Sequence, residues 1–137
     1  MNTIKSCLLL FLLWFPAILW GQRAVISFDT REHDLGSIPE KGGKVSIVFR
    51  FTNQGDKSLI IRKVDTYCGC IRSKWERRPV PPCREGKIPL NYAPEGRSGR
   101  FIRRITVYTN ATPPNHALKI SGNVIAKTKK QPNSTNQ

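Results

Sequence analysis

Apolar and polar residues alternate along much of this chain. The clearest example is residues 44–53, KVSIVFRFTN, where every second residue is apolar: Val45, Ile47, Phe49 and Phe51. A period of two over this length predicts a β-strand that buries one face in a core. Asn53 to Asp56 then form a cluster of turn-favouring residues.

Similar short runs recur, and helical periodicity is almost absent. Strands are expected at residues 25–28, 44–53, 58–65, 86–92, 100–109 and 116–125. The further inward positions expected are Ile88, Leu90, Tyr92, Ile105, Val107, Leu118, Ile120 and Val124. About seven short strands joined by turns predict an all-β, antiparallel immunoglobulin-like β-sandwich. The Cys…Trp…Cys spacing of antibody domains is missing, because Trp75 does not lie between two strand cysteines.

In three segments apolar and polar residues do not alternate cleanly, and their structure is predicted from residue type. Asp29, Glu32 and Asp34 are expected to form a polar turn between the first strands. Residues 58–65, SLIIRKVD, are apolar on both faces at their start, which favours a strand inside a sheet. Residues 66–85 contain a CGC sequence and three closely spaced prolines. Proline donates no backbone hydrogen bond, so this stretch is expected on a surface loop or a sheet edge.

The amino-terminal residues predict export. A start carrying Lys5 precedes the apolar block 6–20, which ends at Gly21. This order is typical of a secretory signal peptide, and the block is short for a membrane span of about 20 residues. We therefore expect a signal peptide at residues 1–21, a sandwich domain at 22–126 and a disordered polar tail at 127–137. The protein would then be periplasmic or secreted, possessing no membrane span after cleavage; an uncleaved anchor helix is the alternative.

The chain is strongly basic. It has 23 Lys and Arg against 9 Asp and Glu, a net charge of +14, and only Lys5 would be lost with the signal peptide. Such a charge favours anionic partners, which for an exported protein means lipopolysaccharide, acidic glycans or phospholipid head groups. The alternative is solvated strand faces with a basic bias. Nucleic acid is not expected, because the strands lack interleaved aromatic residues and export removes the protein from it.

The chain also resembles a known family. The resemblance rests on HDLGSI (33–38), FRFTNQGDKSL (49–59), DTYCGC (65–70), GKIPLNYAPEGRSGRF (86–101) and ITVYTN (105–110). These segments are similar to the bacterial domain-of-unknown-function family 1573, over about residues 26–125. The resemblance implies an exported protein of Gram-negative bacteria whose fold is related to the major-sperm-protein and ASH-type immunoglobulin-like domains. It implies no activity, and Cys83 lies outside the shared pattern.

Cys68, Cys70 and Cys83 are the disulfide candidates. In an extended chain Cys68 and Cys70 would point to the same face, with Cα atoms roughly 6.6 Å apart, near the upper limit for a disulfide. A bond to Cys83 would close a loop of roughly 14 residues and contribute about 3 kcal/mol. We therefore expect Cys70–Cys83 in preference to the other pairings.

The same cysteines allow a metal site as an alternative. Three thiolates at Cys68, Cys70 and Cys83, with His33 or His116, could hold Zn(II) or Cu(I). The spacing is C-x-C rather than the usual C-x-x-C of zinc sites and thioredoxin-type enzymes. The chain also lacks G-x-S-x-G, phosphate-binding glycine loops and H-E-x-x-H. We expect no metal, no cofactor and no enzymatic activity.

The segment after the CGC sequence is the candidate partner-binding site. Five basic residues surround Trp75 in this proline-stiffened stretch: Arg72, Lys74, Arg77, Arg78 and Arg84. Arg and Trp dominate interface energetics, and prolines reduce the ordering cost of binding. The hypothesis is a non-catalytic envelope interaction or structural module that contacts an anionic component or a protein. Two alternatives stay open: Trp75 caps the sandwich while the arginines are solvated, or the protein is a thiol or Cu/Zn-binding envelope protein.

Overall fold

The computed structural model describes residues 21–127. The rest of the predicted signal peptide and of the predicted tail lies outside the described residues, so export, cleavage and tail disorder stay predictions. Across residues 21–127 the chain forms no helix long and apolar enough to cross a membrane.

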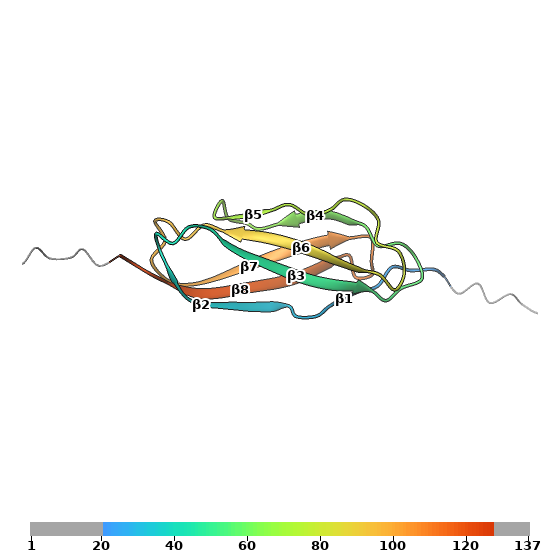
Figure 1. Ribbon diagram of the computed structural model, residues 1–137. Coiled ribbons are helices and arrows are strands. Elements are labelled where there is room, and N and C mark those ends of the chain that lie inside the picture. Colours follow the sequence, from blue (N-terminus) through green and yellow to red (C-terminus); the bar gives the residue numbers. More distant parts are fainter. Residues whose placement is uncertain (1–20, 128–137) are drawn as a thin grey trace, which may run out of the picture.

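Eight strands form two four-stranded sheets packed face to face (Figure 1). The first sheet contains, in spatial order, β1 (Ile26–Phe28), β3 (Val45–Asn53), β6 (Glu85–Tyr92) and β5 (Ile71–Ser73). The second contains β2 (Glu32–Pro39), β8 (Asn115–Ile125), β7 (Gly99–Thr109) and β4 (Ile61–Asp65). The predicted all-β, immunoglobulin-like sandwich is confirmed.

The strand β2 was not predicted. Glu32 and Asp34 lie in this strand instead of forming a polar turn, and only Asp29 precedes it. A register shift between Asp34 and Ser37, where Gly36 has a φ of 64°, breaks the alternation that would have revealed the strand. The strand pairs in parallel with β8, whereas every other strand pairing of the two sheets is antiparallel. The chain therefore changes sheets between β1 and β2.

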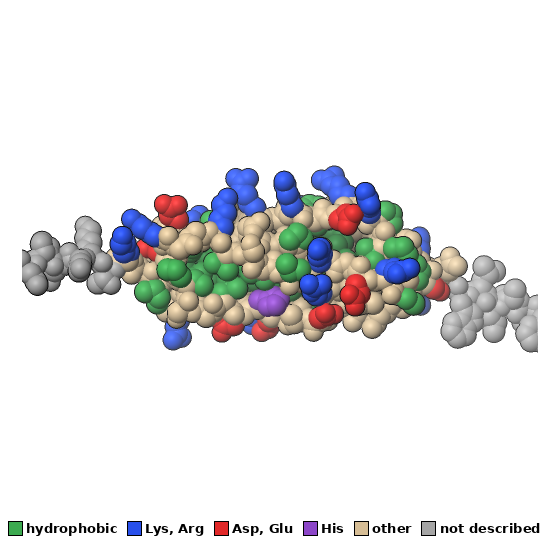
Figure 2. All heavy atoms as spheres, viewed as in Figure 1, with side chains coloured by type: hydrophobic (Ala, Val, Ile, Leu, Met, Phe, Trp, Pro, Cys, Tyr) green, Lys and Arg blue, Asp and Glu red, His purple; other side chains and the backbone are tan. Residues whose placement is uncertain are grey.

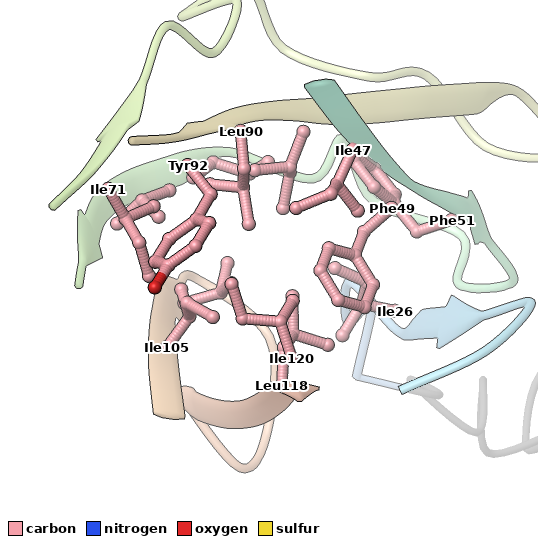
Figure 3. Packing of buried hydrophobic residues seen from close by; sticks show 14 of the residues in the cluster. Ile26, Ile47, Phe49, Phe51, Ile71, Leu90, Tyr92, Ile105, Leu118 and Ile120 are labelled. Atoms are coloured by element: carbon pink, nitrogen blue, oxygen red, sulfur yellow. The ribbon is translucent and has the colours of Figure 1, made fainter. Parts of the chain in front are cut away.

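The core fills the space between the sheets (Figure 3). Side chains of β3 and β6, such as Phe49 and Leu90, point toward those of β7 and β8, such as Ile105 and Ile120, and all four are fully buried. The residues expected to face inward are buried as a group, with Val45 only half-buried at the start of its strand. Burial of these apolar side chains is the main favourable contribution to folding.

The strand β4 lies at a sheet edge, which corrects the expectation that residues 58–65 run inside a sheet. Its only neighbour within the sheet is β7. Leu59 and Ile61 are buried, while Ile60 is 38% exposed. The side chain of Leu59 belongs to the core, and Val80 packs against that core. The Leu59 N–H donates to the Val80 carbonyl at 2.9 Å, and the Val80 N–H donates to the Leu59 carbonyl at 2.8 Å. The proline-containing segment thus shields this end of the strand.

The connection from β4 to β6, residues 66–84, passes from the second sheet to the first along one margin of the sandwich (Figure 1). It contains the short edge strand β5, which pairs with the end of β6. We refer to residues 74–84 as the connecting segment. The placement on a loop and an edge matches the expectation from its prolines.

Candidate functional site

Cys68 and Cys70 form a disulfide with each other. Their Cα atoms are 5.1 Å apart, closer than in an extended chain, because residues 67–70 turn. Tyr67 adopts a φ of 51°, in the left-handed region, at the start of this turn. The expected Cys70–Cys83 pairing is therefore wrong, and Cys83 is a free, exposed thiol.

The position of Cys83 explains why it cannot reach the other two cysteines. The Ala93 N–H donates to the Cys70 carbonyl at one end of β6, whereas the Cys83 N–H donates to the Asn53 carbonyl at the other end. The eight residues of β6 separate these ends by about 25 Å. Neither a disulfide nor a single metal ion can bridge that distance.

The two histidines do not complete a metal site either. The ring of His33 packs edge-on against Phe49, with centroids 4.7 Å apart, and the ring of His116 lies 6.1 Å from Phe28. Within the described part of the chain, no three His, Cys, Asp or Glu side chains gather as metal ligands would. The metal alternative built on the three cysteines does not fit this fold.

Trp75 folds back onto the sandwich. It is half-buried against the core, and its indole Nε1 donates to the Ile61 carbonyl at 3.4 Å. The guanidinium of Arg77 lies 5.6 Å from the centre of the Trp75 ring. This position matches the alternative in which Trp75 caps the sandwich and leaves the basic residues to face solvent.

The five predicted basic residues, Arg72, Lys74, Arg77, Arg78 and Arg84, are all exposed. Arg78 forms an ion pair with Glu76 at 3.3 Å, and both of these side chains are largely exposed. Among the residues that the structure describes, no acidic group lies within 4 Å of the other four.

Two further basic residues join this group, and sequence reasoning missed their relationship. Arg50 of β3 and Lys87 of β6 are direct cross-strand neighbours on the outer face of the first sheet. Alternation alone places Arg50 outward, but only the strand register shows that Lys87 lies opposite. Like charges in this relationship repel and destabilise a sheet. We call the set Arg50, Arg72, Lys74, Arg77, Arg78, Arg84 and Lys87 the basic surface.

The basic surface borders a small pocket of about 190 Å³ between the connecting segment and the start of β6. Its polar lining has three basic side chains and two acidic ones: Arg78, Arg84, Lys87, Glu76 and Glu85. Phe51, Ile61 and Val80 supply apolar contacts. A pocket of this size and charge suits a single small anionic group, such as one phosphate of a larger molecule.

Charge is distributed unevenly over the sandwich. Figure 2 shows Lys and Arg side chains projecting from the margin where β4, β5 and the connecting segment lie. Charges of both signs lie near β1 and β2: Asp29, Arg31, Glu32 and Asp34 are exposed, and Lys119 forms an ion pair with Glu32 at 2.9 Å.

A second polar cluster lies on β4 and β7, next to the disulfide. The Lys63 ammonium donates to Asp65 at 2.9 Å, which lowers the pKa of Asp65 and raises that of Lys63. The Tyr67 hydroxyl donates to Thr106 Oγ1 at 3.2 Å and lies 3.3 Å from the Tyr108 hydroxyl. Because the Tyr67 proton is used toward Thr106, the Tyr108 hydroxyl donates to Tyr67, which raises the pKa of Tyr108. Tyr67 stays 66% exposed.

Comparison with known proteins matches this fold to one family and several solved structures. The family "Protein of unknown function (DUF1573)" matches residues 26–124. A protein of unknown function from Porphyromonas gingivalis W83 is similar at 17% identity and a TM-score of 0.65, over 80% of this chain and 50% of that one. The chain therefore spans half the length of that structure. No curated protein matches the chain.

Two further structures share the architecture. The ASH/PapD-like domain 7 of human CEP192 is 12% identical with a TM-score of 0.55, over 77% of this chain and 88% of that domain. The YadV chaperone is 14% identical with a TM-score of 0.52, over 79% of this chain and 55% of that one. At these identities the likeness shows the fold alone.

Proposed function

The chain belongs to the DUF1573 family, and we propose that this member is a non-catalytic, exported interaction module whose basic surface binds a phosphate-bearing glycolipid of the cell envelope. The proposal combines the predicted signal peptide with the charge distribution of the sandwich. Its fold supports this role, because sandwiches of this kind bind through loops, edges and outer faces.

The observation that carries the proposal is the pairing of Arg50 with Lys87. Their direct opposition is repulsive. Asp29, whose N–H donates to the Arg50 carbonyl, and Glu85 of β6 are acidic neighbours, but no carboxylate of the described chain lies within 4 Å of either charge. A phosphate group placed between the two side chains would accept hydrogen bonds from both and remove the repulsion. A phosphate bound here would therefore gain two charged hydrogen bonds and relieve a repulsion, whereas a phosphate bound to a single solvated arginine would gain only its own contacts.

The neighbouring pocket supports the same ligand chemistry. Arg84 and Lys87 both line it, so a second phosphate of the same molecule could lie close to the first. The exposed Arg72 and Lys74 extend the positive surface along the same margin. Attraction at exposed charges is screened over about 8 Å at physiological salt, so binding should weaken as salt increases.

Binding of the purified protein to immobilised lipopolysaccharide tests this proposal. In the variant Arg50→Thr/Lys87→Thr we expect affinity to fall at least tenfold, because the two paired charges are removed. The matched control is Lys41→Ser/Lys57→Ser, which removes two exposed charges from turns outside the basic surface. We expect less than a twofold loss for this control.

Equal losses in the two double variants would show that net charge alone drives binding, and would refute a defined surface. A third variant, Arg77→Ser/Arg78→Ser, separates the connecting segment from the sheet face. Retention of this variant in the cell envelope at the level of the unmodified protein would remove the segment from the proposed surface.

A further inference from the structure

The Cys68–Cys70 disulfide closes a loop with only Gly69 between its cysteines. A disulfide stabilises a fold mainly by restricting the unfolded chain, and the effect shrinks as the closed loop shortens. This bond therefore restricts the unfolded chain far less than a long-range bond of the same chemistry would. Stabilisation of the fold is therefore a weak reason for a disulfide that closes so short a loop.

The turn that holds the cysteines is fixed by hydrogen bonds that do not involve the S–S bond. The Tyr67 N–H donates to Asp65 Oδ1 at 3.1 Å, and the Thr66 hydroxyl donates to the Cys68 carbonyl at 3.2 Å. At the other side of the turn, the Ala93 N–H donates to the Cys70 carbonyl at 2.8 Å. These contacts would keep the two sulfurs adjacent after reduction, so the bond could open and close without unfolding the domain.

The two sulfurs differ in access and in hydrogen bonding. Cys70 is only 1% exposed, whereas Cys68 is half-buried at the margin of the core and directly follows the exposed Tyr67. The Cys70 N–H donates to Cys68 Sγ at 3.1 Å. A backbone N–H in this position stabilises negative charge on Cys68 Sγ, which favours its thiolate form. Cys68 is thus the sulfur that an external thiol can reach. Once it is bound in a mixed disulfide, it is also the sulfur that leaves readily as a thiolate.

We propose that Cys68–Cys70 is a thiol–disulfide exchange site that transfers its disulfide to a polypeptide containing two cysteines. In the first step a substrate thiolate attacks Cys68 Sγ, forming a mixed disulfide, and the Cys70 thiolate leaves and is protonated. In the second step the other substrate thiolate attacks the substrate sulfur of the mixed disulfide. This releases Cys68 as a thiolate beside the Cys70 N–H. The substrate is oxidised to a disulfide, and the protein's own disulfide is reduced to two thiols.

A polypeptide is the substrate class that the surroundings favour. The exposed Tyr67 directly precedes Cys68 in the chain, and its hydroxyl lies 3.3 Å from that of Tyr108. Tyrosine is enriched at protein interfaces, because it supplies large contact area together with a hydrogen-bonding group. This arrangement differs from thioredoxin-type sites, in which a C-x-x-C sequence starts a helix, so sequence patterns for those enzymes do not detect it.

The first test compares the two sulfurs in single-cysteine variants of the full chain, with Cys7 and Cys83 both replaced by Ser. Cys70→Ser leaves Cys68 alone, and Cys68→Ser leaves Cys70 alone. Each is incubated with oxidised glutathione, and mixed-disulfide formation is followed by mass spectrometry. We expect Cys68 to react at least tenfold faster than Cys70. Equal rates, or faster reaction of Cys70, would overturn the assigned roles.

The second test keeps both cysteines, so that it does not depend on a variant that lacks one of the pair. The oxidised Cys7→Ser/Cys83→Ser protein is mixed with a reduced peptide that contains two cysteines. We expect one peptide disulfide to form for each Cys68–Cys70 bond opened, while circular dichroism shows an unchanged β-sheet signal. A Cys68→Ser/Cys70→Ser control should form none. Transfer that occurs only after the protein is unfolded in urea would overturn the proposal.

Discussion

The side-chain amide of Asn53 donates a hydrogen bond to the backbone carbonyl of Val80 at 2.9 Å. This contact joins the turn after β3 to the connecting segment, 27 residues later in the chain. The same amide donates to the Lys57 carbonyl at 2.8 Å, and Asn53 Oδ1 accepts from the Gly55 N–H at 3.0 Å. One fully buried side chain thus fixes both the turn and the segment that carries much of the basic surface.

Replacing Asn53 with Ala should destabilise the domain by about 3 kcal/mol. The substitution leaves the Lys57 carbonyl and the Gly55 N–H without their partner, while the Val80 carbonyl still accepts from the Leu59 N–H. Each buried polar group left unpaired costs about 1–3 kcal/mol. Urea denaturation followed by circular dichroism measures the effect. Asn91→Ala is the control, because Asn91 is exposed and its Oδ1 accepts only from the Ser46 hydroxyl. A loss below 1 kcal/mol for Asn53→Ala would contradict the role given to its amide.

Gly86 is required by its neighbour across the sheet. Phe51 lies opposite Gly86 in the register of β3 and β6, and a Cβ at Gly86 would overlap the Phe51 ring. Gly86→Ala should therefore cost about 1–3 kcal/mol, since a well-packed site cannot accept the added group without moving the ring. At Gly69 no atom lies within 4 Å of an added Cβ, so Gly69→Ala should change stability by less than about 0.5 kcal/mol. Equal effects in the two variants would refute this explanation.

The sequence predicts most of the sandwich because burial of one strand face imposes a period of two. The prediction fails where the alternation of buried and exposed residues is interrupted. In β2 the shift at Gly36 changes which residues face the core, and the surrounding charges make the strand resemble a turn. Around the start of β4, Leu59 and Ile61 are buried but Ile60 is 38% exposed, so the second apolar face is an exposed isoleucine and does not indicate a strand inside the sheet.

The candidate site was only partly predictable for a related reason. The basic residues of the connecting segment are evident from their number, but Arg50 and Lys87 become neighbours only through the register of two strands far apart in sequence. The spacing argument predicts the wrong cysteine pair because it assumes an extended chain at residues 67–70, where the structure has a turn. Local spacing cannot reveal that Cys70 and Cys83 lie at opposite ends of β6.

The pairing of Arg50 with Lys87 implies a conflict between stability and ligand binding. Lys87→Glu should replace repulsion with attraction across the strands and stabilise the domain by about 0.2–1 kcal/mol at low salt. The same change should weaken binding to lipopolysaccharide at least tenfold. Urea denaturation at 20 mM and 500 mM NaCl tests the first effect, which salt should diminish. A destabilised Lys87→Glu protein at low salt would contradict the repulsion.

The pH dependence of stability should reflect His116. Burial lowers the pKa of His116 from its ordinary value of 6.5, the charge of Arg31 lowers it further, and a hydrogen bond to the backbone of Pro113 partly opposes both. Below pH 6.5 the unfolded chain therefore binds more protons at this position than the folded domain, so stability decreases as the pH falls through the folded-state pKa. The slope from this one group is at most about 1.4 kcal/mol per pH unit. His116→Gln should flatten the dependence between pH 7 and 5.5, measured by urea denaturation, and an unchanged slope in this variant would exclude His116 as its source.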